Sequence, residues 1–327
     1  MGLDIYAGTL TRYYSHNWKT VVQQWAEENG YAFNRITPDG EPADNEEELS
    51  PAEVQAAVEN WRDQILNAIS QPGQPPYAPW PENNESPYYT DKPDWDAFGA
   101  MLLAAACHTY EEPVPPTVEK DWNFGEHPLV ARLAADQERV WSLFRGATWW
   151  LPLPDAFFFQ APLPTDDTAA IGTVGGLRKE LEKLNQLAWQ ADEDTILDWA
   201  DTEGYPADGT VGPDGQYSKA DISEHTQYDT QSLAKFAFSM FWRAMRFAEE
   251  QRRPFYWIIK EELYGIRCQF SPDFAGRNAG MVFYPAFLGT AGAGGKGAGP
   301  CRTARNGGLL CGKISGYSAG RCGDRAG

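Results

Sequence analysis

The sequence predicts an α+β fold, namely a mostly helical single domain with a small sheet formed from the N-terminal strand and the strands near residues 255–288. Apolar residues recur at helical spacing through most of the first 288 positions, which indicates amphipathic and buried helices. Short β-branched and aromatic segments, bounded by glycine and proline, stand at both ends of this region and favour strands. Both patterns stop at Gly289, so we expect one acidic globular domain over residues 1–288.

The first elements follow from short patterns. Residues 2–8 alternate weakly between apolar and polar and are predicted to form a strand, with Leu3 and Ile5 on one side. Residues 9–16 are interpreted as a polar and aromatic connection. After it, Asn17 is a favourable N-cap for a helix that carries one apolar stripe and stops at Gly30.

The remaining helices show clearer signals. Ser50 and Glu53 predict a capping box, with Pro51 at the first helical position of a helix over 51–69. The helix over 95–109, with Asp94 as its expected N-cap, is apolar on nearly all sides, which indicates a buried helix. Further helices are expected over 128–145, 177–190, 193–200 and 230–252.

Proline-rich segments separate these elements. Residues 71–93 hold seven prolines and no periodic apolar pattern, which is typical of a long irregular loop of functional or mobile character. Residues 149–159 are aromatic and broken by proline, consistent with a short strand or packed coil. Residues 255–259, 264–270 and 281–288 are predicted strands that pair with the N-terminal strand, because a lone strand leaves its backbone polar groups unsatisfied.

From Gly289 the composition changes abruptly. The last 39 residues contain 13 of the 31 glycines and three of the five cysteines. Such a segment buries too little apolar surface to offset its conformational entropy, so residues 289–327 are predicted to form a disordered basic tail. Out-of-frame reading of GC-rich DNA yields this composition and would make the tail non-native. The alternative is a functional basic tail that folds back onto the acidic domain.

Charge limits the classes of partner. The tail carries +5, which leaves −24 for residues 1–288 of a chain whose total is −19. Nucleic-acid binding depends on cations that displace condensed counterions, so we expect neither nucleic acid nor anionic lipid as a partner. A basic protein is the expected partner, because opposite charge speeds the encounter. The alternative is that the charge only keeps the protein in solution.

Targeting signals are sparse. The first residues lack the basic region and apolar run of a secretory signal. The longest apolar stretch, residues 98–107, is far shorter than the ~18–20 residues that span a bilayer. We therefore expect a cytoplasmic protein that does not enter the membrane.

The motifs predict no cofactor and no metal. Residues 172–176 are glycine-rich and precede a helix, but the Lys-Ser/Thr of a phosphate-binding loop is missing. The acidic stretch 192–214 lacks the ligand spacing of a calcium loop, because position twelve counted from Asp201 is Gly212. No paired Cys/His spacing indicates zinc.

The candidate catalytic residues lie near the first predicted strand. Asp4, Arg12 and His16 are close in sequence, and we expect them to gather at one edge of the sheet. A carboxylate, a guanidinium and an imidazole in one place can bind an anion or transfer protons. The alternative is an Asp4–Arg12 ion pair beside a surface histidine.

The candidate binding residues are aromatic or acidic: Tyr13, Tyr14, Trp149, Trp150, Glu261 and Glu262. An acid pair beside an aromatic wall is one half of a glycosidase cleft, which also needs a second carboxyl group ~5–10 Å away. The alternatives are core packing for the aromatic residues and an ordinary acid pair at a strand edge for the glutamates.

We therefore expect a non-enzymatic binding protein of the bacterial immunity or antitoxin type, which masks a basic partner protein. The acidic domain, the acidic and aromatic loops and the lack of catalytic motifs favour this hypothesis. The alternative is a hydrolase with a cleft at the N-terminal strand edge. That alternative requires Asp4, Arg12 and His16 to converge on one concave pocket.

Overall fold

The computed structural model describes most of the chain before residue 260. The described residues are 3–30, 49–70, 73–165, 167–206, 209–211, 217–219, 226–259 and 282–285. By its internal contacts the chain divides into residues 1–288 and 289–327, and every described residue belongs to the first unit. The predicted strand over 264–270 and the predicted tail lie outside the described residues, so the domain boundary and the disorder of the tail stay predictions.

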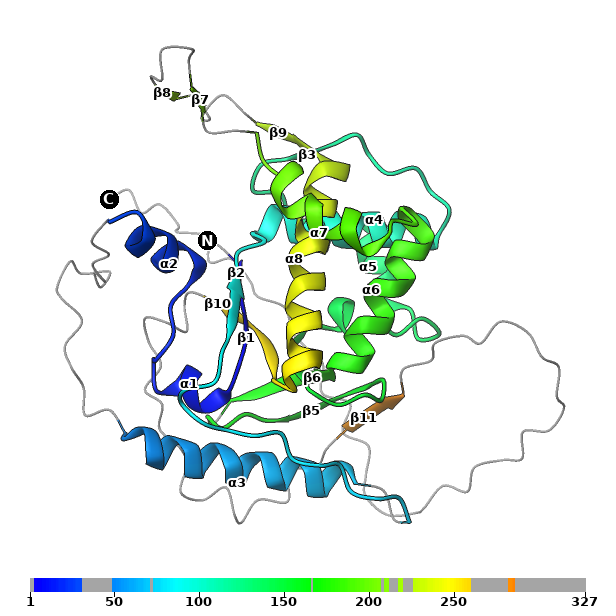
Figure 1. Ribbon diagram of the computed structural model, residues 1–327. Helices are drawn as coiled ribbons and strands as arrows, with labels where there is room; N and C mark the ends of the chain where they lie inside the picture. Colours follow the sequence, from blue (N-terminus) through cyan, green and yellow to red (C-terminus); the bar gives the residue numbers. More distant parts are fainter. Residues whose placement is uncertain are drawn as a thin grey trace, which may run out of the picture. The chain divides into compact units, whose positions relative to one another are not determined.

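A mixed sheet of seven strands, in the order β11-β5-β6-β4-β10-β1-β2, organises the first unit (Figure 1). β4 and β6 are parallel, and the other neighbouring pairs are antiparallel. The strands are β1 (Leu3–Ala7), β2 (Tyr89–Asp91), β4 (Ala147–Leu151), β5 (Phe157–Pro162), β6 (Thr168–Thr173), β10 (Phe255–Ile259) and β11 (Val282–Pro285).

The fold prediction is confirmed in part. The N-terminal strand does lie beside residues 255–259, since β1 pairs with β10 from Leu3↔Ile259 to Ala7↔Phe255. The sheet is larger than expected, however, and the fold is mixed α/β instead of mostly helical. β11 lies at the far edge beside β5 and does not pair with β1. The sequence understated the sheet because β5 and β6 are buried on both faces for part of their length, so they lack a clean alternation.

One face of the sheet is covered by helices that share a buried cluster with Leu3 and Ile5 of β1. α4 (Trp95–Thr109) and α8 (Thr230–Gln251) pack against each other, and α6 (Val174–Ala188) and α7 (Glu193–Thr202) pack against α8 (Figure 1). α5 (Pro128–Ala135) packs on α4. α4 is buried along nearly its whole length, as its uniformly apolar sequence predicted.

The opposite face carries a second buried cluster around Tyr6 of β1 and Tyr256 of β10. α1 (Leu10–Tyr14) and α3 (Pro51–Ile69) cover it. α3 begins at the predicted capping box. α2 (Val21–Glu28) begins at a capping box of Thr20 and Gln23, so the predicted N-cap Asn17 was wrong. Successive side chains of β1 point to opposite faces of the sheet, so this one strand contributes residues to both buried clusters.

Shorter elements complete the described part. β3 (Thr117–Glu119) pairs with β9 (Gln227–Asp229), and β7 (Gly209–Val211) pairs with β8 (Tyr217–Lys219). The 3₁₀ helices are η1 (Phe124–Glu126) and η2 (Leu143–Arg145). The helix predicted over 128–145 is thus broken after Ala135. None of the helices in the described residues is long and apolar enough to cross a membrane.

Candidate functional site

The three predicted catalytic residues lie in different settings. Asp4 is buried within β1, on the same face as Tyr6. Arg12 donates from Nη1 to the Ser86 carbonyl at 2.6 Å, and its guanidinium lies 4.4 Å from the centre of the Tyr88 ring. His16 is exposed just after α1. The donors of Arg12 therefore serve backbone carbonyls of Asn17 and of the proline-rich loop, which accounts for this arginine without catalysis.

That loop is held in place by further arginines and by one carboxylate. Their bonds join Arg62 to Trp80, Arg252 to Ala78, and Arg253 to Pro81 and Ser86. Buried Glu82 accepts from the backbone and hydroxyl of Thr11 at 2.9 and 3.0 Å, and from the Trp80 indole at 2.9 Å. The described part of the loop is thus a packed strap over the second face of the sheet.

The four aromatic binding candidates are core residues. Tyr13, Tyr14, Trp149 and Trp150 are all buried. Trp149 stacks on Tyr256 with ring centres 4.7 Å apart, and Trp150 stacks on Phe255 on the other face of the sheet at 5.1 Å. Packing explains these positions, as the alternative interpretation held. Glu261 and Glu262 lie outside the described residues.

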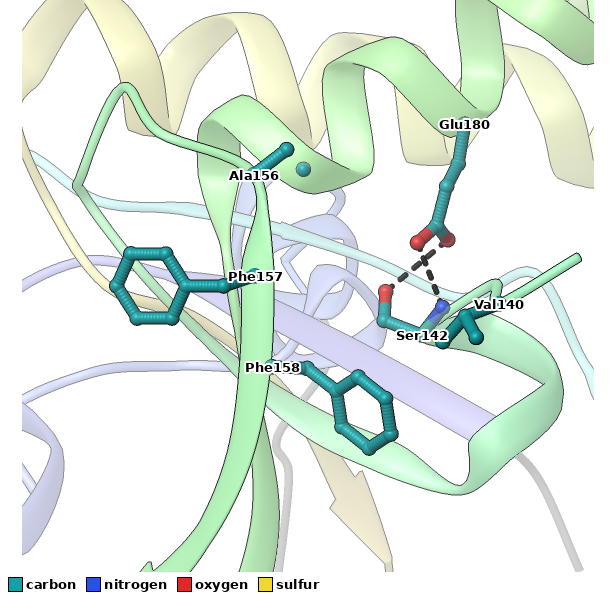
Figure 2. A pocket seen from close by; sticks show the side chains of 7 residues that line it. Val140, Ser142, Ala156, Phe157, Phe158 and Glu180 are labelled. Atoms are coloured by element: carbon teal, nitrogen blue, oxygen red, sulfur yellow. Dashed lines mark hydrogen bonds between the residues drawn. The ribbon is translucent and has the colours of Figure 1, made fainter. Parts of the chain in front are cut away.

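A small hollow lies where α6, β5 and the residues before η2 meet (Figure 2). Glu180 of α6 is buried beside it and accepts from the Ser142 backbone at 2.6 Å, the Ser142 hydroxyl at 3.0 Å and the Leu143 backbone at 3.3 Å. Trp150 donates to the Ser142 hydroxyl at 2.9 Å. The hollow has room for about one water molecule, which is too little for a substrate.

Burial raises the pKa of Glu180 to about 7, against the hydrogen bonds from Ser142 and Leu143 and the charge of Lys183, all of which lower it. A carboxyl group that titrates near neutral pH is a common feature of catalytic sites. Here, however, its oxygens accept from the backbone N–H groups of Ser142 and Leu143 at the start of η2. The Ser142 hydroxyl also links Glu180 of α6 to Trp150 of β4. We interpret Glu180 as a structural carboxylate.

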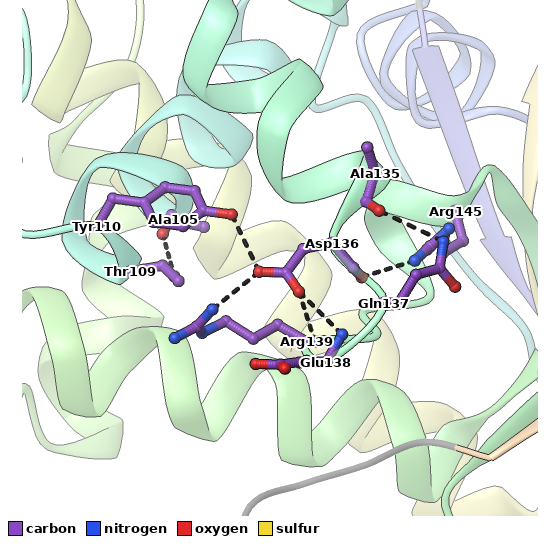
Figure 3. Close-up of polar contacts among 9 residues, drawn as sticks. All are labelled: Ala105, Thr109, Tyr110, Ala135, Asp136, Gln137, Glu138, Arg139 and Arg145. Atoms are coloured by element: carbon purple, nitrogen blue, oxygen red, sulfur yellow. Dashed lines mark hydrogen bonds and ion pairs between the residues drawn. The ribbon is translucent and has the colours of Figure 1, made fainter.

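A second structural carboxylate follows α5 (Figure 3). Asp136 accepts from the backbone of Glu138 at 2.9 Å, from the guanidinium of Arg139 at 2.8 Å and from the hydroxyl of Tyr110 at 3.2 Å. Burial raises the pKa of Asp136, but these hydrogen bonds outweigh it and hold the pKa at about 2. This carboxylate stabilises the turn that follows α5. Its two oxygens already accept four hydrogen bonds, so none of their acceptor positions is left for a ligand.

A different arrangement occurs at the start of α4. Asp94, Asp96, Asp121, Tyr205 and Tyr228 gather there from four segments, and we call these five residues the acidic site. The backbone of Asp121 donates to Asp96 Oδ2 at 3.1 Å, and the two tyrosine rings meet edge to face with centres 5.0 Å apart. All five residues belong to one unit of the fold, so the site is built by the fold itself.

The backbone at this site is strained. Asp94 has φ 61° and ψ 160°, a region that is essentially restricted to glycine and costs about 1–3 kcal/mol. Asp121 has φ 55°, also in the positive range. Although Asp94 occupies the N-cap position of α4, its side chain makes no cap hydrogen bond. The predicted helix bounds were correct, but the predicted capping by the Asp94 side chain was wrong.

The negative charge of the acidic site is poorly compensated. Lys92 Nζ lies 3.9 Å from Asp94 Oδ2, beyond hydrogen-bonding distance. Within the described residues, the carboxylates of Asp96 and Asp121 form no ion pair. Burial raises the pKa of Asp96, and the neighbouring charges of Asp121 and Asp94 raise it further, against the Asp121 hydrogen bond and Lys120. The arrangement therefore favours an added cation.

The described residues at the acidic site do not form a metal-binding group. The described part of the chain holds no group of three or more His, Cys, Asp or Glu side chains placed to bind one. One feature of the sequence points to the acidic site, namely the pair Asp94 and Asp96 at a helix start. An aspartate in that position is more readily interpreted as a helix N-cap than as part of a binding site. Asp121 and the tyrosines gave no local signal, because only tertiary contacts bring them there.

The chain resembles no known protein closely enough to add to this description, since no family model, no curated protein and no solved structure matches it.

Proposed function

We propose that the chain is a non-enzymatic binding protein of the bacterial immunity or antitoxin type, which masks a basic partner protein by accepting its cationic side chains at the acidic site. The observation that carries the proposal is the poorly compensated aspartate group of Asp94, Asp96 and Asp121, whose one ion-pair partner within the described residues is Lys92 at 3.9 Å. The net charge of −24 over residues 1–288 supports it, because such a field attracts a basic partner over long range.

The energetics of the acidic site support a role beyond stability. Like charges held together destabilise a fold, and the backbone of Asp94 adds about 1–3 kcal/mol. A side chain that capped α4 would instead contribute about 0.5–2 kcal/mol. Asp94 therefore forgoes one stabilising interaction and adds a destabilising one. A cationic group from a partner would offset both the repulsion and the lost interaction.

The alternative hydrolase has less support. Its proposed cleft at the N-terminal strand edge uses Arg12, whose guanidinium is occupied by the carbonyls of Asn17 and of Ser86 in the strap. The small hollow beside Glu180 is lined by other residues and has no room for a substrate. The binding hypothesis needs neither feature.

The test compares two variants with equal charge. One carries Asp94→Asn, Asp96→Asn and Asp121→Asn; the control carries Glu28→Gln, Glu112→Gln and Glu182→Gln, three exposed carboxylates away from the acidic site. The probe is a fluorescent octa-arginine peptide, followed by anisotropy at about 0.05 M and about 0.5 M salt. Thermal unfolding of both variants confirms that each is folded.

We expect the wild-type protein to bind at low salt and to release the peptide at high salt. The acidic-site variant should bind about tenfold more weakly or worse, since three partly exposed charge pairs contribute about 0.2–1 kcal/mol each. The control should lose less than about threefold. Equal losses in the two variants would mean that only bulk charge attracts the peptide. No binding by the wild-type protein at low salt would refute the proposed function.

A further inference from the structure

We propose that the second face of the sheet carries a binding surface for a proline-rich peptide of a partner protein, and that the strap fills this surface as an intramolecular ligand. The site is separate from the acidic site and does not depend on the proposed function. The proposal follows from the hydrogen bonds that hold residues 78–86 of the strap, which runs from α3 past α1 to β2 (Figure 1).

Every backbone carbonyl from Ala78 to Ser86 accepts a hydrogen bond from a side chain outside the strap. The nine donor–acceptor distances lie between 2.6 and 3.5 Å. Six of these carbonyls accept from arginines, namely Arg12, Arg62, Arg252 and Arg253. The other three accept from Thr9, Asn17 and Gln55. We call these seven donor residues the strap-binding surface.

The strap is held in the manner of a bound peptide. Among the described residues, no backbone–backbone hydrogen bond involves residues 78–86, and these residues form neither helix nor strand. Pro79 and Pro81 hold residues 78–81 in extended conformations and remove two N–H donors, which leaves carbonyls as the main backbone partners. Proteins that bind proline-rich peptides use this preformed geometry, because little conformational entropy is lost on binding.

Two side chains of the strap supply specificity. Trp80 is 1% exposed and packs edge to face on Trp61 of α3, with ring centres 6.5 Å apart. Glu82 is buried and accepts from the backbone and the hydroxyl of Thr11 in α1. The pattern that the strap-binding surface selects is therefore an aromatic residue, a proline and an acidic residue in succession.

The strap leaves one donor of this surface unused. Arg253 is 7% exposed and donates from Nη1 to Pro81 and from Nη2 to Ser86. Its Nε is buried and has no hydrogen-bond partner within the described residues. A buried donor without an acceptor is unfavourable, so a peptide with one more acceptor beside Arg253 would fit the surface better than the strap does.

The test uses a fluorescein-labelled peptide with the sequence of residues 76–88, followed by anisotropy with the full chain at about 0.15 M salt. In the wild-type protein this peptide competes with the strap, whose effective concentration is on the order of millimolar, so binding should be weak. Trp80→Ala removes the main anchor of the strap and leaves the strap-binding surface intact. This variant should bind the peptide at least about tenfold more tightly than the wild type.

Trp61→Ala is the matched control, because it removes an equally buried tryptophan of the same contact from the side of α3. It should bind the peptide no more tightly than the wild type. Glu82→Ala removes the second anchor, and it repeats the comparison with a strap that keeps its tryptophan. It should also bind the peptide more tightly than the wild type, and thermal unfolding confirms which variants are folded.

Three outcomes would overturn the inference. Equal gains in Trp80→Ala and Trp61→Ala would mean that a loosened core attracts the peptide without specificity. No gain in any folded variant with a weakened strap would mean that the strap is only a packed loop. A wild-type dimer in light scattering that Trp80→Ala dissociates would mean that a second copy, and not a partner protein, supplies the peptide. None of these results bears on the proposed function, whose probe is octa-arginine.

Discussion

Replacing Glu180 with glutamine tests how a buried carboxylate joins α6 to η2 and β4. The carboxylate accepts from the backbone and the hydroxyl of Ser142 at 2.6 and 3.0 Å (Figure 2). It also accepts from the Leu143 backbone at 3.3 Å. A glutamine amide offers one oxygen and one NH₂, so either Ser142 N or Leu143 N is left without an acceptor. An unsatisfied buried donor costs about 1–3 kcal/mol. Loss of the buried charge acts in the opposite direction, and the balance depends on pH.

The sign of that pH dependence follows from the raised pKa. Between the ordinary value of 4.5 and the folded value of about 7, the native protein holds a proton on Glu180 that the unfolded chain has released. Stability therefore falls as pH rises through this window and levels off above it. For these two pKa values, the contribution of Glu180 falls by about 2–3 kcal/mol between pH 5 and pH 8.

The measurement is urea unfolding of wild type and Glu180→Gln at several pH values, followed by tryptophan fluorescence. Other carboxyl groups titrate equally in both proteins, so the difference in free energy of unfolding isolates Glu180. We expect that difference to shift by about 2–3 kcal/mol in favour of the variant from pH 5 to pH 8. Glu182→Gln, an exposed site on the same helix, is the control and should show no such shift. A constant difference, or a shift toward the wild type, would refute the reasoning.

Two other substitutions probe the backbone. Gly175→Ala should lower the free energy of unfolding by about 2–3 kcal/mol, because its Cβ would stand 2.0 Å from the Pro154 carbonyl oxygen; urea unfolding beside the control Gly125→Ala, whose Cβ has ordinary space, checks this. Asp94→Gly should raise the midpoint of urea unfolding, by about 1 kcal/mol in free energy, while it weakens octa-arginine binding. An unchanged or lower midpoint in that variant would argue against strain at Asp94.

The sequence predicted the elements whose signals are local. α3 has the expected bounds, because its capping box and Pro51 mark the start and its apolar stripe continues to Ile69. α4 and β10 also have the expected bounds. β5 and β6 were missed or left open, because residues buried on both faces lose the period of two. α1 was missed because its five residues are too few for periodicity to show.

The candidate site was harder to predict than the fold. Asp94 gave a correct boundary and an incorrect role, since an aspartate before an apolar run usually caps the helix. Its φ of 61° is set by the surrounding structure and leaves no trace in the sequence. The aromatic candidates failed for the opposite reason, because a tryptophan that lines a cleft and one that fills a core look alike in sequence. The arginines that bind the strap could not be recognised from the sequence either. Their acceptors are mainly backbone carbonyls, which every residue carries, so no residue type marks the contact.

Comparison of the carboxylates within this one chain supports a receptor role for the acidic site. Glu180, Glu82 and Asp136 each accept several hydrogen bonds within the fold. The aspartates of the acidic site have one backbone donor and one distant lysine among them. The fold can satisfy buried carboxylates, yet here it holds three aspartates together, two of them with positive φ, with few partners. A cationic side chain of a basic partner, the occupant proposed above, would supply the charge that these aspartates lack.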